Sequence, residues 1–369
     1  MKRRAVTVKD VARRAGVSPG TVSNVLRGEK AVRPATRDLV MSAVSDLNYR
    51  VNSAASYLRT GRSRIIGAIV PSLENPFFPT VLAAVERQCQ ADGYELIVAS
   101  SAEDPEVETA RVAALLQWKP AGFIVIPCST DFPARRLIEA AHIPLVYADR
   151  APDGVPSDFI EIDNVAAGTA AARHLVQLGH RRIAVCAPSL AVRNIQERIA
   201  GVSHVMAEFG ARPVQVETGF GDVLDPLPER GEAQISGVTA IVALMNTTTL
   251  RVLAALHRIG RSIPDDVSLV GFDDYPWMPV ARPSITAIRQ PVGTLGKSAW
   301  ARLRDRIGGA DDAPHHRKLE VELILRDSTA PVRQSPLTQL PSAAVSRREP
   351  EMDAHEDQLP SRERDGISG

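Results

Sequence analysis

The sequence predicts an α/β protein with a small helical head and a larger body built on two parallel β-sheets. Three observations lead to this prediction. Apolar residues recur at helical spacing near the start of the chain, short apolar runs alternate with amphipathic stretches from Ile65 onward, and positive charge is concentrated before that point. Continuous apolar strands that alternate with helices are typical of parallel sheets covered on both faces.

The head is expected to hold three helices. Thr7 can cap the first in a variant of the capping box, and Gly16 ends it. Its apolar residues follow the spacing of one buried helix face: Val8, Val11, Ala12 and Ala15. Ser18 can cap the second helix, with Pro19 at its first position, and Pro34 opens the third. Two helices joined by a three-residue turn form a helix-turn-helix, and the third helix supports it.

Charge separates the head from the body. Residues 1–64 contain 14 Lys and Arg against four acidic residues, a net charge of +10, whereas the remaining residues carry −9. A basic segment attached to an acidic body suggests a module that binds a polyanion, joined to a part that does not.

The body is expected to contain two similar α/β halves, with the second sheet starting near Asn164. The predicted strands are Ile65–Val70, Leu96–Ala99, Phe123–Ile126, Leu145–Ala148, Ile183–Cys186, Ala240–Leu244 and Val267–Gly271. The predicted helices are Phe78–Asp92, Val107–Trp118, Arg135–Ala141, Ala166–Leu178, Gln196–Phe209 and Leu250–Ile259. Ligands of such folds bind at the carboxyl ends of the strands. That rule indicates the loops at 71–78, 149–150, 189–193, 246 and 273–277.

Composition excludes several classes of protein. A length of 369 residues with 44% hydrophobic content is enough for two or three domains and too apolar for a disordered chain. The longest apolar runs, such as Phe123–Ile126, are far shorter than the roughly 20 residues that a membrane helix needs. No apolar region follows the basic start, so we expect no secretory signal.

Two features remain outside this pattern. The three cysteines, Cys89, Cys128 and Cys186, are too far apart for a disulfide framework or a zinc site. We therefore expect buried thiols in a reducing cytoplasm. After about Ala330 the chain is interrupted by prolines and contains no aromatic residue, which predicts a disordered tail over residues 331–369.

Two segments resemble catalytic motifs in the wrong structural context. The segment from Gly16 to Gly20 matches G-x-S-x-G, but that motif needs a preceding strand, and here a helix precedes it. Gly296-Lys297-Ser298 resembles the end of a phosphate-binding loop, but Pro291 stands where the earlier glycine is required. We expect a helix to start near Pro291 instead. The histidines show no metal-binding spacing, and His180 is expected to be a structural hydrogen-bonding residue.

Several motifs together resemble one family. Val6–Ser18 and Thr21–Leu26 closely resemble the DNA-binding head of the LacI/GalR family of repressors. Further matches follow in the family's order and spacing: Leu47-Asn48-Tyr49, Asn75-Pro76-Phe77-Phe78, Leu178 to Ala184, Pro264 to Ser268, and Gly271 to Asp274. The resemblance covers roughly residues 6–328.

The resemblance implies a dimeric, cytoplasmic transcription repressor without a cofactor, controlled by a small ligand. The body would resemble a periplasmic sugar-binding protein, with a first lobe near 65–163, a second near 164–288, and a return to the first lobe around 290–318. The implied domains are a helix-turn-helix head over 1–51, a hinge helix and linker over 52–64, and an effector-binding and dimerisation domain over 65–330.

The resemblance also assigns DNA contacts. The helix beginning at Ser18 would enter the major groove of a near-palindromic, double-stranded operator. Pro19, Gly20 and Asn24 occupy the base-reading positions, whereas Ser18, Thr21 and Ser23 occupy phosphate-facing ones. The segment from Asn52 to Arg59 matches the hinge helix, in which Leu58, with Ala55 beside it, would insert into the minor groove. Val51 departs from the family, which often has proline there.

An effector site is implied between the two lobes. Family positions that hydrogen-bond the ligand are matched by Asp149, Arg150, Arg198, Asn246 and Asp273. Phe77 or Phe78 and Trp277 could form apolar platforms for sugar rings. Arg193 adds a second cation near Arg198, which suggests an acidic sugar or another carboxylate, although arginine also binds neutral hydroxyls.

Other functions remain open at this stage. The runner-up is a repressor that needs a nucleobase-like corepressor, since the sign of the coupling between ligand and DNA cannot be derived from the sequence. A solute-binding protein that does not bind DNA is a second alternative, opposed by the charge of the head. An enzyme of α/β architecture is a third, opposed by the absence of a catalytic motif in its proper context.

Overall fold

The structure is a computed structural model that describes residues 6–27, 32–49, 63–222 and 225–333. The chain divides into two units, Met1–Val332 and Arg333–Gly369, and of the second unit only Arg333 is described. The predicted hinge helix and almost all of the predicted tail therefore lie outside the described residues.

The head consists of three helices, α1 (Val8–Ala15), α2 (Pro19–Arg27) and α3 (Pro34–Asp46), around one apolar cluster. Thr7 and Asp10 form the expected capping box, in which the Thr7 amide donates to the Asp10 carboxylate at 2.9 Å. Gly16 ends α1 with a φ of 67°, a left-handed conformation that glycine adopts without strain. The helix-turn-helix prediction is confirmed. The cluster comprises Val11, Ala12, Ala15, Val22, Val25, Val40 and Ala43.

The first lobe is built on six parallel strands in the order β11-β5-β4-β3-β1-β2. Their bounds are β1 (Ile65–Val70), β2 (Glu95–Ser100), β3 (Gly122–Val125), β4 (Leu145–Ala148), β5 (Phe159–Ile162) and β11 (His316–Leu319). Helices α5 (Phe77–Ala91) and α12 (Val292–Ile307) pack together, and α6 (Pro105–Leu116) packs with α7 (Arg135–Ala140). Their buried residues fall into separate clusters, so the two helix pairs cover opposite faces of the sheet.

The second lobe has the strand order β12-β10-β9-β8-β6-β7, in which only the β10–β12 pair is antiparallel. Its strands are β6 (Ile183–Ala187), β7 (Val214–Glu217), β8 (Ala240–Ala243), β9 (Ser268–Phe272), β10 (Thr286–Arg289) and β12 (Glu322–Ile324). Helices α8 (Asn164–Gln177) and α9 (Arg193–Ala207) pack on one face, and α10 (Glu229–Ser236) and α11 (Asn246–Arg258) supply apolar residues to the cluster on the other.

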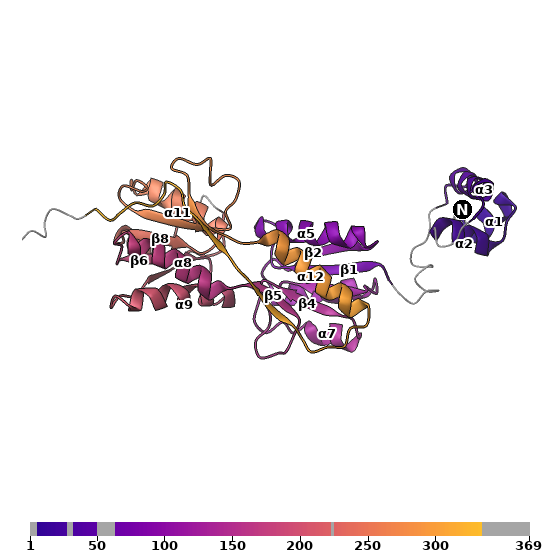
Figure 1. Ribbon diagram of the computed structural model, residues 1–369, viewed down its shortest axis with the longest axis horizontal. Helices are drawn as coiled ribbons and strands as arrows, with labels where there is room; N and C mark the ends of the chain where they lie inside the picture. The colour runs from indigo at the N-terminus through magenta and orange to yellow at the C-terminus, as the bar shows by residue number, and fades with distance from the viewer. Residues whose placement is uncertain (1–5, 28–31, 50–62, 223–224, 334–369) are drawn as a thin grey trace, which may run out of the picture. The chain divides into compact units, whose positions relative to one another are not determined.

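The chain crosses between the lobes three times. It passes from β5 to α8, returns from β10 to α12, and leaves again from β11 to β12 (Figure 1). The first two crossings lie where the sequence predicts them, near 164 and 290. The third was not predicted, because β11 and β12 are only four and three residues long and β11 is largely polar.

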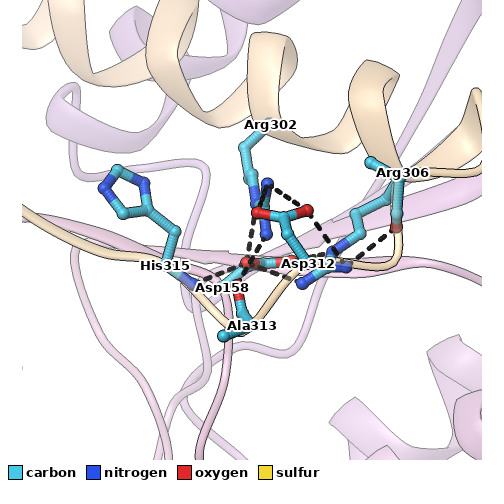
Figure 2. Close-up of polar contacts among 7 residues, drawn as sticks. Asp158, Arg302, Arg306, Asp312, Ala313 and His315 are labelled. Atoms are coloured by element: carbon cyan, nitrogen blue, oxygen red, sulfur yellow. Dashed lines mark hydrogen bonds and ion pairs between the residues drawn. The ribbon is translucent and has the colours of Figure 1, made fainter.

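An ion-pair network fixes the return of the chain into β11. The carboxylate of Asp158, next to β5, accepts hydrogen bonds from the Nε atoms of Arg302 and Arg306, each at 2.7 Å (Figure 2). It also accepts from the backbone amide of His315 at 2.9 Å. Arg302 reaches Asp312 at 2.9 Å as well. These bonds tie the end of α12 and the start of β11 to the first lobe.

Several sequence predictions concern residues that proved structural. His180 is 3% exposed, and its ring nitrogens lie 3.0 Å from the hydroxyls of Thr239 and Ser268, which confirms its structural role. Pro291 directly precedes α12, as expected. Cys89 and Cys186 are buried, as expected, whereas Cys128, in the loop after β3, is only half-buried. In the described part of the chain, no helix is long and apolar enough to span a membrane.

Candidate functional site

The second helix of the head presents its amino end to solvent. Ser18, Pro19 and Gly20 are exposed, and Thr21, Ser23 and Asn24 are half-buried. The Ser18 hydroxyl accepts a hydrogen bond from the Thr21 amide at 3.1 Å, so it caps α2 as predicted. The predicted base-facing and phosphate-facing residues therefore lie on one short stretch of helix. The remaining predicted DNA contacts, Asn52, Ala55 and Leu58, lie outside the described residues.

The predicted effector residues come from loops at the carboxyl ends of strands in both lobes. Asp149 and Arg150 follow β4 in the first lobe, Asn246 starts α11 just after β8, and Asp273 follows β9. Arg198 lies in the second turn of α9, which begins three residues earlier than the sequence predicts. All five are buried, with exposed fractions of 9% or less. The structure brings them together, because parallel strands end at the same edge of each sheet.

Arg198 lies at the centre of this cluster. Its Nε donates to Asn164 Oδ1 at 2.9 Å and its Nη1 donates to the Leu244 carbonyl at 2.6 Å. The guanidinium lies 3.9 Å from the centre of the Phe272 ring, within range of a cation–π interaction. Burial lowers the pKa of Arg198, and the charges of Asp149 and Asp273 oppose that shift.

Close helix packing fixes the position of Arg198. A Cβ atom at Gly168 of α8 would lie 1.9 Å from the Arg198 carbonyl oxygen, and one at Gly201 would lie 2.1 Å from the Val165 carbonyl oxygen. Both positions therefore need glycine for α8 and α9 to approach this closely.

Two carboxylates face this arginine. Burial raises the pKa of Asp149, against the effect of Arg150 and Arg198, and its carboxylate accepts from Asn194 Nδ2 at 3.1 Å. Asp273 accepts from Asn246 Nδ2 at 2.8 Å and also from the Gln290 amide. Asn246 Nδ2 in turn lies 2.9 Å from Asn75 Oδ1, a contact between the two lobes.

The Arg150 side chain is also neutralised. Its Nη1 lies 3.4 Å from Glu103 Oε2, its Nε lies 3.7 Å from Asp149 Oδ2, and its guanidinium faces the Phe78 ring at 5.6 Å.

Phe77 and Phe78 are 4% and 1% exposed and belong to the first-lobe core, so their rings offer little surface to a ligand. Trp277 is half-buried and packs against the apolar cluster of the second lobe.

Arg193 lies apart from the central cluster. It begins α9, and its guanidinium pairs with Glu197 at 3.1 Å and with Asp153 of the first lobe at 3.4 Å. Both of these partners are acidic, so this arginine has no charge left over for an acidic ligand.

A hollow of ≈ 670 Å³ opens beside the cluster, between the loops of the two lobes. Its walls include Asn75, from the loop predicted at 71–78, and residues that were not predicted, among them Glu103, Phe220, Thr248 and Arg251. The Arg251 Nη1 is held by the Gly219 carbonyl at 2.6 Å. Asn194 and Gln290, in contact with the central carboxylates, were not predicted from the sequence either.

Among the described residues, no cluster of three or more His, Cys, Asp and Glu side chains could hold a metal ion.

A helix-turn-helix head joined to two parallel-sheet lobes, with a polar cluster between the lobes, defines the class of ligand-responsive DNA-binding regulators. Residues 7–52 match the model of the bacterial regulatory proteins of the lacI family, and residues 172–329 match the periplasmic binding protein-like domain. The chain belongs to the LacI family.

Individual relatives extend over most of the chain. It is 31% identical to the HTH-type transcriptional regulator CelR of Thermobifida fusca, with 89% of this chain and 99% of that protein covered. A Lac repressor dimer bound to operator and the anti-inducer ONPF has 26% identity and a TM-score of 0.77, covering 89% of this chain and 100% of the other. A CelR–cellobiose complex has 27% identity and a TM-score of 0.64, covering 88% and 99%.

Proposed function

We propose that this protein is a cytoplasmic, homodimeric repressor that binds a near-palindromic operator and is released from it by a neutral sugar. The division into a head over 1–51, a hinge and linker over 52–64, an effector-binding and dimerisation body over 65–330 and a tail over 331–369 is part of the proposal. Family membership and the exposed amino end of α2 support the DNA-binding role.

The choice of a neutral sugar depends on two buried acceptor atoms. Asn194 Oδ1 and Gln290 Oε1 are buried and have no hydrogen-bond partner among the described residues. The NH₂ group of Asn194 donates to Asp149, and that of Gln290 donates to Asp273. The amide oxygen of each residue is therefore left free, and an amide oxygen can only accept a hydrogen bond. A ligand that satisfies both oxygens must donate hydrogen bonds. Hydroxyl groups donate, whereas a carboxylate or an ionised phosphate only accepts.

Charge supports the same choice. Arg150 and Arg198 already face Glu103, Asp149 and Asp273, and Arg193 faces Asp153 and Glu197. An acidic ligand at any of these three arginines would have to displace a carboxylate, whereas Arg251, which lines the hollow, is bonded to the carbonyls of Gly219 and Pro226. The sugar-acid alternative suggested by Arg193 is therefore the weaker one. That a CelR structure contains cellobiose also favours a sugar.

A calorimetric titration of the full chain tests the ligand class. Neutral mono- and disaccharides are expected to bind more tightly than sugar acids and sugar phosphates, whose charged groups cannot donate to these oxygens. Purines, whose N–H groups also donate, are the competing class in this titration. Asn194→Ala should weaken sugar binding about tenfold or more, since one hydrogen bond in a desolvated site contributes about 1.5 kcal/mol. Gln177→Ala, which removes an exposed amide from α8, serves as the control and should bind as the wild type does. Binding of a sugar acid or a purine alone would overturn the proposal.

A further inference from the structure

Asn164 lies at the first crossing between the lobes. It is the first residue of α8, two positions after β5 ends at Ile162, and its side chain is fully buried. None of the DNA and effector assignments made from the sequence includes it.

The Asn164 amide connects three charged side chains. Its Oδ1 accepts from Arg198 Nε at 2.9 Å, whereas its Nδ2 lies 3.4 Å from Glu161 Oε2 and 3.3 Å from Glu197 Oε2. The Ile162 carbonyl, also 3.4 Å from Nδ2, is a further acceptor. A guanidinium only donates and a carboxylate only accepts, so this orientation of the amide is the one that satisfies its partners. Glu161 belongs to the first lobe, and Glu197 and Arg198 belong to the second.

Glu161 is also bound to the strand that returns from the second crossing. Its Oε1 lies 2.7 Å from His316 Nε2 and 3.8 Å from Lys318 Nζ, both in β11. Burial raises the pKa of Glu161, and the charge of Glu197 raises it further. The N–H groups of Asn164 thus lie between two carboxylates that repel each other across the lobe boundary.

We propose that Asn164 is a positioning residue that couples Arg198 to the first crossing between the lobes. The inference rests on the proposed function in one respect, that Arg198 contacts the effector. An amide is planar, so a ligand that moves the guanidinium turns the whole group and shifts its N–H donors away from Glu161 and Glu197. Because those carboxylates belong to different lobes, each lobe arrangement has its own set of bonds to Asn164. A ligand that favours one set shifts the equilibrium between arrangements.

Two substitutions separate the two halves of the amide. Asn164→Ala removes both, whereas Asn164→Asp keeps an acceptor for Arg198 and removes the donors to Glu161 and Glu197. The readouts are sugar affinity and the ratio of operator affinities without and with sugar. Asn164→Ala should lose about tenfold in sugar affinity. Asn164→Asp should keep sugar affinity within about threefold but reduce the operator ratio about fivefold or more.

Asp163→Ala is the matched control, because it removes the α8 cap, a hydrogen bond from the Ala166 amide at 2.9 Å, without contacting Arg198. It should keep the wild-type operator ratio. A wild-type ratio in Asn164→Asp, or the same loss in Asp163→Ala, would overturn the inference.

A second measurement needs no ligand. Spin labels at Ala113→Cys on α6 and Ala207→Cys on α9, both exposed, report the distance between the lobes in a Cys128→Ser background. Asn164→Ala should broaden the distance distribution relative to the wild type and to Asp163→Ala. Identical distributions would overturn the inference. If no sugar acts on the wild type, the proposed function fails, and this measurement still decides the role of Asn164.

Discussion

Replacement of Arg198 perturbs both stability and effector binding, and the structure separates the two. Arg198→Ala removes two hydrogen bonds, at 2.9 and 2.6 Å, the contact with the Phe272 ring, and the positive charge that faces Asp149 and Asp273. Breaking a buried, paired charge costs about 3–5 kcal/mol. A typical domain has only about 5–15 kcal/mol of stability, so this variant should be severely weakened.

Arg198→Lys is the more informative variant. It keeps the charge but loses the planar fork and one of the two hydrogen bonds, which costs about 1.5–3 kcal/mol. The lysine variant should therefore fold and bind operator, while sugar binding falls about tenfold or more. Urea denaturation of both variants gives the stability change, and titration of operator with and without sugar gives the response. Loss of less than about 1 kcal/mol in Arg198→Ala, together with a full sugar response, would refute the assignment of Arg198 to a buried effector site.

Other parts of the molecule give further expected outcomes. Operator affinity should fall steeply as the salt concentration rises, because the basic head neutralises several phosphates. A logarithm of the affinity that does not change with the logarithm of the salt concentration would contradict this. Leu58→Ala should weaken binding to operator and spare binding to random DNA, since a wedge acts only where the duplex kinks; equal losses in a mobility-shift assay would refute a wedge. Asp158→Asn should cost about 3 kcal/mol at neutral pH by urea denaturation. Burial raises the pKa of Asp158, but hydrogen bonds from Arg306, His315 and Arg302 outweigh it and lower the pKa below its ordinary value. The stabilisation by the Asp158 carboxylate is complete above its unfolded-state pKa and disappears as the pH falls through its folded-state pKa. If the loss of unfolding free energy in Asp158→Asn did not change with pH, that result would be inconsistent with the network.

Much of the architecture could be predicted from the sequence, because most strands are continuous apolar runs. The strand β5 was missed for the opposite reason: Phe159-Ile160-Glu161-Ile162 contains a glutamate that is 1% exposed. Its burial depends on His316 and Lys318, more than 150 positions later, and periodicity does not detect such a partner. The strand β11 that supplies them is mostly exposed and polar.

The candidate site was predictable only where family motifs occur. Asp149, Arg198, Asn246 and Asp273 match such positions and lie together, whereas Asn194 and Gln290 are single amides in otherwise unremarkable segments. A signal for the burial of Phe77 and Phe78 was present: with Val81, Leu82 and Val85 they follow the spacing of a buried helix face. That spacing favours a role in the core over one as an exposed platform.

The most direct test of the account is one operator titration of the full chain. An operator is first selected from random duplexes, and its affinity is then measured with and without a neutral sugar that binds the wild type. We expect a near-palindromic operator and a loss of affinity of about fivefold to 150-fold when the sugar is present. Failure to select any sequence, or an unchanged affinity with the sugar bound, would contradict the proposal that a sugar between the lobes controls DNA binding.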